Sequence, residues 1–210
     1  MPGLTPGHTE RSNMSTTFAF PKDFSTESGG SGYYKFEQGA NKFRIMSEPI
    51  FGQEYWQSEK DEKGNLVPGT DGMPKRKPVR VKLSETVPVS ELEVDRWGNP
   101  GRVNHFMAMV VYDWKEGVFK ILSITQKQVN AGIKALVESE DWGNPQDYDI
   151  TVTKNGSGRE TKYAVMPGSK KKMPENIVEE YEKKTFNLEA LFENADPFVN
   201  TEDDKTKMPF

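Results

Sequence analysis

The chain has 210 residues, of which only 34% are hydrophobic, so we expect one domain of ordinary size with long polar segments. The net charge of −4 argues against nucleic acid as a partner, but lysines and arginines gather in the middle of the chain and carboxylates near its C-terminal end, and local potential governs phosphate binding. The absence of cysteine excludes disulfides and thiolate zinc sites, two histidines are too few for a histidine metal site, and no apolar run reaches membrane-spanning length, so we expect a soluble cytoplasmic protein.

Residues 1–32 are rich in Ser, Thr and Gly, which predicts a flexible N-terminal arm. Phe18, Phe20 and Phe24 make this arm too apolar for a pure spacer. Packing of part of the arm on the domain or on a neighbouring protein therefore stays open.

Three strands are predicted in the first half of the folded region. Residues 41–57 are apolar and extended, with Pro49 and Gly52 placing a bend or bulge within one long strand. Residues 58–103 read as a long loop, because Gly and Pro recur and a basic run occupies 73–78. Residues 104–114 form a strong strand, which 115–117 turn tightly into a strand at 118–125.

A helix and two further strands are predicted next. Apolar residues recur at helical spacing in 126–139, with Thr125 as a plausible N-cap. Residues 148–154 alternate between apolar and polar, and a Gly-rich turn leads to a last strand at 161–166.

This order of elements is that of an OB-fold, a five-stranded Greek-key barrel whose middle strands and two flanking loops bind oligonucleotides. We therefore predict a mainly β domain over 33–167, with one helix between strands 3 and 4 and the long insertion 58–103 between strands 1 and 2. The insertion and the turn at 155–160 hold the positions of the two binding loops. OB-folds also bind sugars and proteins, so the fold alone does not fix the ligand.

After the domain, residues 168–192 are predicted as a linker, which includes Lys170-Lys171-Lys172, followed by a helix from Pro174 to Phe192. Residues 193–210 form an acidic tail that stops at Met208-Pro209-Phe210. A terminal carboxylate behind an apolar ring can anchor in a basic-rimmed pocket of a partner. The alternative is a solvated terminus. The candidate partner-binding residues are Phe198, Asp203, Asp204, Pro209 and Phe210.

Binding a single strand requires cations that track the phosphates and flat rings on which bases stack. Phe106, Tyr112 and Trp114 share one face of the strand 104–114, and Met107, Met109 and Val111 share the other. We assign the Met/Val face to the core and the aromatic face to the ligand, the alternative for each ring being a place in the core. The candidate DNA-binding residues are Arg44, Tyr55, Trp56, Lys75, Arg76, Lys77, Arg80, Lys82, Trp97, Arg102, Phe106, Tyr112, Trp114, Lys120, Lys154 and Arg159.

The register of the hairpin after Trp114 is open, because 115–117 can form a two- or three-residue loop. In one register Lys120 lies beside Tyr112, and in the other Phe119 and Ile121 do.

Four stretches resemble single-stranded DNA-binding proteins of tailed bacteriophages. They are Lys42-Phe43-Arg44-Ile45-Met46, Gly52-Gln53-Glu54-Tyr55-Trp56, Ile124-Thr125-Gln126-Lys127 and Asp147-Tyr148-Asp149-Ile150-Thr151-Val152-Thr153. The resemblance covers roughly sixty per cent of the chain. It implies an OB-fold, sequence-independent binding of single-stranded DNA, and a role in genome replication or recombination in the cytoplasm of the infected host. Some phage relatives carry a zinc site, which this cysteine-free chain cannot build in the same way.

The acidic tail also looks like the C-terminal tip of single-stranded DNA-binding proteins, where carboxylates lead to a terminal Pro-Phe that docks on replication and repair proteins. It implies partners of that kind in addition to the DNA.

Enzymatic function is not indicated. The chain lacks a Gly-x-x-x-x-Gly-Lys-Ser/Thr loop, and the glycines at 155–158 lie between two strands, as in a hairpin turn. Asp147 and Asp149 are expected on the exposed side of a strand without a third metal ligand. We predict no catalytic residue, metal or cofactor. A protein-interaction module built on the same barrel, RNA as the ligand, and a monomer or a homodimer remain as alternatives.

Overall fold

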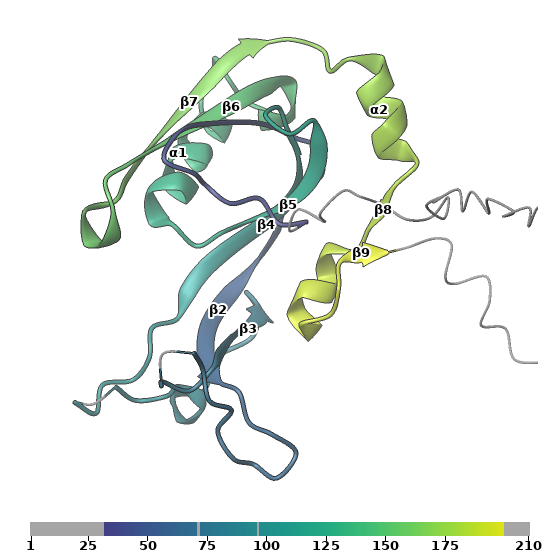
Figure 1. The fold of residues 1–210 in the computed structure, drawn as a ribbon. Coiled ribbons are helices and arrows are strands. Elements are labelled where there is room, and N and C mark those ends of the chain that lie inside the picture. Colours follow the sequence, from purple (N-terminus) through teal and green to yellow (C-terminus); the bar gives the residue numbers. More distant parts are fainter. Residues whose placement is uncertain (1–31, 71, 96, 200–210) are drawn as a thin grey trace, which may run out of the picture. The chain divides into compact units, whose positions relative to one another are not determined.

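The computed structural model describes residues 32–70, 72–95 and 97–199 (Figure 1). The predicted arm therefore lies outside the described residues except for Gly32, as do residues 200–210 of the predicted tail. Seven antiparallel strands form one sheet, in the order β3-β2-β4-β1-β6-β7, and β5 pairs with the other edge of β4. The strands are β1 (Gly39–Ile45), β2 (Ile50–Ser58), β3 (Arg76–Lys82), β4 (Asn104–Asp113), β5 (Val118–Ile124), β6 (Tyr148–Asn155) and β7 (Lys162–Lys170).

The predicted first strand is two strands that lie end to end along β4. Phe43 of β1 is opposite Asp113, and Ile50 of β2 is opposite Ala108. Between them the chain bends at 46–49, where the hydroxyl of Ser47 accepts a hydrogen bond of 2.9 Å from the backbone N–H of Val110. The bend thus includes Pro49, as predicted, whereas Gly52 lies inside β2.

Gly52 is needed for close packing rather than for a bend. A Cβ at this position would lie 2.5 Å from both the Phe106 ring and the carbonyl oxygen of Val81. Only glycine lets the neighbouring strand and ring approach β2 so closely.

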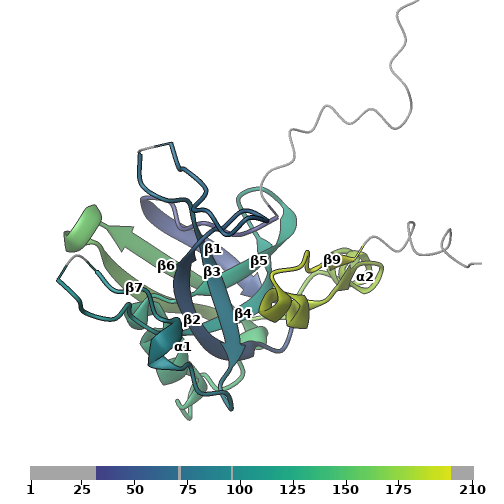
Figure 2. The same ribbon diagram turned by 90° about the horizontal axis from the view of Figure 1, so that it is seen from below.

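The prediction of a loop over 58–103 is wrong in its middle, because β3 lies there. β3 pairs with β2 over its whole length, from Lys82 opposite Gly52 to Arg76 opposite Ser58. Pro78 is compatible with this strand because β3 is the edge of the sheet. β2 and β3 extend away from the rest of the sheet in Figure 1 and face the viewer in Figure 2. From here on, "the arm" means residues 50–103 and not the N-terminal residues 1–32.

The predicted helix is confirmed as α1 (Lys127–Val137), which is shorter than 126–139. Its N-cap residue is Gln126, not Thr125, and no side chain caps it. Val129 and Ile133 bury its apolar stripe in the main core, together with the Met/Val face of β4. The assignment of Met107, Met109 and Val111 to the core is therefore confirmed.

The predicted helix from Pro174 to Phe192 is confirmed only as far as Glu182, and the prediction of one continuous helix is wrong. Instead, several short elements follow one another and pack on the other face of β4 and β5, where they form further apolar clusters with Phe106, Val110 and Ile121. They are α2 (Glu175–Glu182), β8 (Thr185–Phe186), the 3-10 helix η4 (Leu188–Glu193) and β9 (Phe198–Val199).

The sheet is not closed into the predicted five-stranded barrel. β7 continues past the predicted end of the last strand to Lys170, with a register shift opposite Tyr148 and Ile150. Within the described part of the chain, β5 and β7 do not pair with each other. The mainly β class is confirmed, but the number of strands is seven rather than five. No helix in this part is long and apolar enough to cross a membrane.

Candidate nucleic-acid interface

The arm contains an open groove of about 980 Å³ that is lined by two exposed tryptophans. Trp56 of β2 is 45% exposed, and Trp97, in the connection from β3 to β4, is 71% exposed. Arg76 and Arg102 line the same groove. Two predicted stacking rings and two predicted phosphate contacts, which are up to 46 positions apart in sequence, therefore meet at one surface.

A tight turn holds Trp97. The Asp95 carboxylate accepts hydrogen bonds from the backbone N–H groups of Trp97, at 2.8 Å, and Asn99, at 2.9 Å. Gly98 between them has a φ of 84°, which only glycine adopts without strain. The hydrogen bonds from the backbone and the side chain of Asn99 hold the pKa of Asp95 below its ordinary value, so the carboxylate stays ionised as an acceptor.

The β3–β4 connection is fastened to β2 by a second set of hydrogen bonds. The Tyr55 hydroxyl donates to the Glu91 carboxylate at 2.7 Å, and the Gln57 amide donates to the Glu91 backbone carbonyl at 3.1 Å. The backbone N–H of Ser58 donates to the Glu93 carboxylate. Tyr55 also lines the groove, but it is only 2% exposed, so its ring is not available as a stacking surface for a base. Burial and then Glu91 raise the pKa of Tyr55 to about 12, which keeps its hydroxyl protonated.

Most of the basic run that the sequence assigned to DNA is ion-paired. Lys75 pairs with Glu59 at 2.8 Å, and Arg76 pairs with Glu93 at 3.4 Å. Arg80 pairs with Glu54 and Lys82 with Glu189, each at 2.8 Å. These pairs weaken the positive potential that the sequence predicted for this segment.

The strand also separates these cations. Arg76, Arg80 and Lys82 alternate along β3 and share the face of Trp56, whereas Lys77 points to the opposite face. Arg80 is the least accessible of them, since its side chain is 14% exposed and its guanidinium lies 5.5 Å from the Phe106 ring centre.

Two predicted cationic contacts are buried structural groups instead. The Arg44 guanidinium is 1% exposed and binds the Asp149 carboxylate at 2.7 Å. Lys120 is 8% exposed and pairs with Asp113 at 3.1 Å and with Glu116 at 2.6 Å. The assignment of Arg44 and Lys120 to DNA binding is therefore wrong, because a buried ion pair is not accessible to phosphate.

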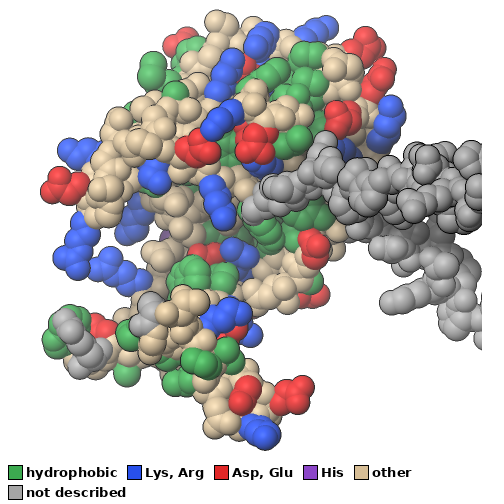
Figure 3. All heavy atoms as spheres, in the orientation of Figure 1, with side chains coloured by type: hydrophobic (Ala, Val, Ile, Leu, Met, Phe, Trp, Pro, Cys, Tyr) green, Lys and Arg blue, Asp and Glu red, His purple; other side chains and the backbone are tan. Residues whose placement is uncertain are grey.

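Two other predicted DNA contacts, Lys154 and Arg159, lie where β6 turns into β7. The Lys154 ammonium donates to the backbone carbonyl of Phe36 at 3.2 Å, and its side chain is half-buried. Arg159, in the β6–β7 turn, is exposed. Figure 3 shows Lys and Arg side chains spread over the part of the molecule that β6 and β7 form.

The aromatic face of β4 is covered, so its assignment to the ligand is wrong for Phe106. The Phe106 ring is 2% exposed and packs 5.7 Å from the Phe192 ring of η4. Tyr112 and Trp114 are half-buried and contact each other edge to face at 5.1 Å. Phe119 is directly opposite Tyr112, so of the two registers the one with Phe119 beside Tyr112 is right, and the turn between the strands has four residues, 114–117.

Asp149 was expected at the surface, but its side chain is 3% exposed. Burial alone would raise its pKa, but hydrogen bonds from Lys171 and Lys42 and the charge of Arg44 outweigh burial and lower the pKa. Asp147 is exposed, so the two carboxylates do not form a pair at one site.

Phe198 packs inside the described structure. Its ring lies 6.0 Å from both Tyr33 and Phe186. Phe198 is half-buried in these contacts, and its role as a partner anchor stays a prediction. Asp203, Asp204, Pro209 and Phe210 lie outside the described residues.

Comparison with known proteins supports the resemblance seen in the sequence. The chain is 26% identical over 155 residues to a protein of Escherichia phage T5 named "Probable ssDNA-binding protein". The match covers 69% of this chain and 59% of the phage T5 protein, so the chain spans less than two thirds of its relative. No family model and no solved structure matches the chain. The predicted resemblance to phage single-stranded DNA-binding proteins is thus confirmed by a distant relative from phage T5.

Proposed function

We propose that this protein binds single-stranded DNA, without sequence preference, in the groove of the arm. The observation that carries the proposal is the meeting of Trp56, Trp97, Arg76 and Arg102 at one open surface. Exposed rings offer every base a stacking partner worth about 1–3 kcal/mol, and guanidinium groups track the phosphates. The name of the phage T5 relative supports the same ligand.

We further propose that the sheet is an open variant of the OB-fold. The pairings of β4 with β5, β1 with β6 and β6 with β7 are those expected between strands 2–3, 1–4 and 4–5 of such a barrel, with its first strand divided into β1 and β2. The arm then takes the place of the loop between strands 1 and 2, one of the two loops that bind ligands in this fold.

In this proposal the protein is a binding protein without catalysis, which coats and protects single strands during phage replication or recombination in the host cytoplasm. The acidic tail 193–210, which carries Asp203, Asp204, Pro209 and Phe210, recruits replication and recombination proteins. Support for this wider role comes from the phage relative and from the composition of the segment.

The proposal is tested by titrating the protein with oligo-dT while recording tryptophan fluorescence. Two of the four tryptophans line the groove, so stacking should quench a large part of the signal. Binding should weaken as salt rises, because phosphate contacts release counterions. A parallel titration with oligo-U tests the preference for DNA. An unchanged spectrum with oligo-dT would contradict the proposal and favour a protein-interaction module.

A further inference from the structure

Three cations converge on one carboxylate near β6 and β7, which lie at the edge of the sheet opposite β3. Asp149 of β6 binds Arg44 at 2.7 Å and the ammonium groups of Lys42 and Lys171 at 3.0 Å each. One negative charge cannot neutralise three positive ones, so this cluster carries excess positive charge. Excess charge of one sign creates a local positive potential that attracts anions.

The excess charge is accessible only through the two lysines. Arg44 is buried, with a side chain 1% exposed, and it also donates to the backbone carbonyls of Gln146 and Lys171, at 3.3 and 3.1 Å. Lys42 and Lys171 are each 50% exposed. An ammonium group has three N–H donors, and Asp149 occupies only some of them.

A ring adjoins these two lysines. The Lys42 and Lys171 ammonium groups lie 5.5 and 5.1 Å from the centre of the Trp114 ring, at cation–π distance. The surface therefore combines a flat ring and cations, the same elements as the groove of the arm.

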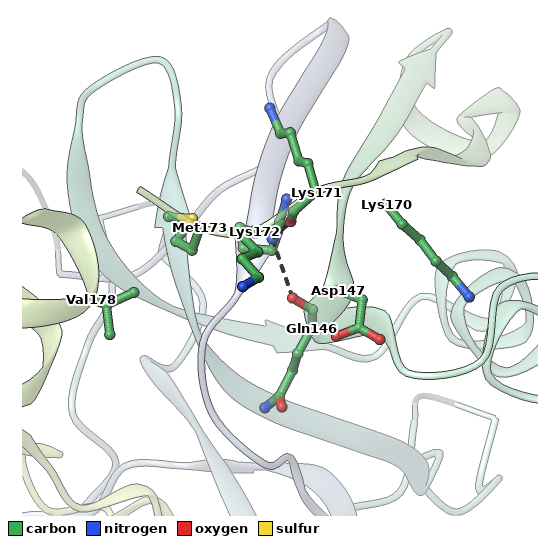
Figure 4. A pocket seen from close by; sticks show the side chains of 8 residues that line it. Gln146, Asp147, Lys170, Lys171, Lys172, Met173 and Val178 are labelled. Carbon is green, nitrogen blue, oxygen red and sulfur yellow. Dashed lines mark hydrogen bonds between the residues drawn. The ribbon is translucent and has the colours of Figure 1, made fainter. Parts of the chain in front are cut away.

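The cationic surface continues along the end of β7. Lys170 and Lys172 flank Lys171 around a pocket of about 640 Å³, whose one lining carboxylate among the described residues is Asp147. Figure 4 shows that the ammonium groups of the three consecutive lysines spread to different sides rather than converge. A compact anion is held by donors that converge on it, whereas spread cations fit the successive phosphates of an extended strand.

We propose that Lys42, Trp114, Lys170, Lys171 and Lys172 form a second contact surface for single-stranded DNA, which we call the β7-end surface. This inference rests on the proposed function. It extends the path of the bound DNA beyond the groove of the arm. Of these residues the sequence indicated only Trp114, because Lys170–172 read as linker and Lys42 as part of a strand.

The test is a Lys42→Ala/Lys171→Ala variant, titrated with a long fluorescein-labelled oligo-dT at several salt concentrations. The buried Asp149 keeps Arg44 as its partner, so the variant should fold. Each lost phosphate contact should reduce the slope of log K against log salt by about 0.7, or about 1.4 for both. The matched control is Lys134→Ala/Lys183→Ala, which removes the same charge from exposed positions outside both surfaces and should keep the wild-type slope.

The outcomes separate the inference from the proposed function. If the wild-type protein does not bind the oligonucleotide, the proposed function itself is wrong. If the wild type binds and the Lys42/Lys171 variant keeps the same slope as the control, only the β7-end surface is refuted. A Trp114→Phe variant, which keeps a ring against Tyr112, should retain the salt slope but quench less.

A second titration distinguishes single-stranded DNA from free phosphate as the ligand of the β7-end surface. In a Trp56→Phe/Trp97→Phe background, the signal reports Trp114 and Trp142 alone. At constant ionic strength, oligo-dT should change this signal at a far lower concentration than inorganic pyrophosphate. An equal response to pyrophosphate would overturn the strand proposal and assign the surface to free phosphate groups.

Discussion

Tyr55 and Trp56 are neighbours in the sequence, yet the structure gives them opposite roles. Successive side chains of a strand point to opposite faces, and at this point of β2 the β3–β4 connection covers the face of Tyr55 but not that of Trp56. The hydroxyl of Tyr55 donates a hydrogen bond to the Glu91 carboxylate, while the Trp56 ring remains at the surface. The covering segment returns from about 35 positions further along the chain, so the sequence around β2 does not reveal which ring is buried.

The sequence likewise does not reveal which charged side chains are buried. Arg44 is a plausible phosphate contact by residue type, but its buried partner Asp149 lies 105 positions away in β6. Pairing at this distance depends on the order of strands in the sheet, which local patterns do not show. Of the predicted cations, those that line the groove, Arg76 and Arg102, are still candidates for phosphate contact.

The first residue-scale prediction concerns Asp149 and pH. Because the pKa of Asp149 is lowered in the folded protein, its ionised form stabilises the fold above its unfolded pKa of about 3.9, and this contribution is lost as the pH falls through the lower folded value. Asp149→Asn should therefore reduce the free energy of unfolding by about 3 kcal/mol at pH 7, since it leaves three cations without their carboxylate.

Urea unfolding of wild type and variant at pH 7, 5 and 3 measures this. The difference between the two proteins should stay nearly constant from pH 7 to 5 and shrink toward pH 3. A difference that stays the same at pH 3 would mean that Asp149 does not titrate between the folded and unfolded states as described.

At the scale of elements, β3 is the strand that the sequence did not predict. Val79 and Val81 alternate with polar residues as in a strand, but Pro78 and the dense lysines and arginines around them favoured a loop. An edge strand tolerates both, because one of its sides needs no partner. The alternation of the two valines was the signal that could have identified it.

The C-terminal segment was the other element predicted wrongly. Its apolar spacing favoured one helix over 174–192, yet the α-helix ends at Glu182 and the chain becomes extended at Thr185. Thr185, which is β-branched, and Asn187 are both poor helix formers, so they favour an end of the helix before this point. The extended part lets Phe186 and Leu188 reach the outer face of β4 and β5, which a single straight helix would not cover to the same extent.

Two turns of the arm share one design and provide a matched experiment. Asp61 accepts hydrogen bonds from the backbone of Lys63 and Asn65 just as Asp95 does from Trp97 and Asn99, but the first turn carries no aromatic ring. Asp95→Ala should loosen Trp97 and weaken oligo-dT binding about three- to tenfold, as part of a stacking contact is lost.

Asp61→Ala is the control, because it removes the same charge and the same kind of turn. Either variant should change stability by less than about 1 kcal/mol, since both turns are exposed. Fluorescence anisotropy gives the two affinities. Equal affinities for Asp95→Ala and Asp61→Ala would show that the position of Trp97 does not matter for binding.

For the whole molecule, the order of β4, β5, α1, β6 and β7 along the chain was predictable, because turn residues and apolar periodicity are local. The position of the ligand surface was not. The C-terminal segment covers Phe106, Val110 and Ile121 on the side of β4 and β5 that the sequence assigned to the ligand, so the two most exposed tryptophans, Trp56 and Trp97, lie on the arm instead. Such coverage by a distant segment is a property of the assembled fold.

The acidic segment 200–210 gives a prediction at this scale. A tethered anionic segment competes with DNA for cationic surfaces at a high effective concentration. Neutralising it, with Glu202→Gln, Asp203→Asn and Asp204→Asn, should leave oligo-dT binding equal or tighter at low salt, with the difference lost at high salt. Neutralising exposed Glu140, Glu179 and Glu182 changes the net charge equally and serves as the control.

A partner experiment accompanies this titration. Replacing Pro209 and Phe210 by alanine should abolish capture of replication proteins from infected-cell extract while sparing DNA affinity. Identical sets of captured proteins from both forms would leave the segment without a recruiting role.

The central claim is that a single strand stacks on the tryptophans of the arm, and the affinity of a Trp56→Ala/Trp97→Ala variant for fluorescein-labelled oligo-dT tests it most directly. Loss of two stacking contacts of at least about 1 kcal/mol each should weaken binding about 30-fold or more, without a large change in melting temperature. Phe51→Ala is the control, because Phe51 is 51% exposed on the same strand but does not line the groove, and it should bind as the wild type does. Wild-type affinity in the double tryptophan variant, or an equal loss in Phe51→Ala, would contradict the claim.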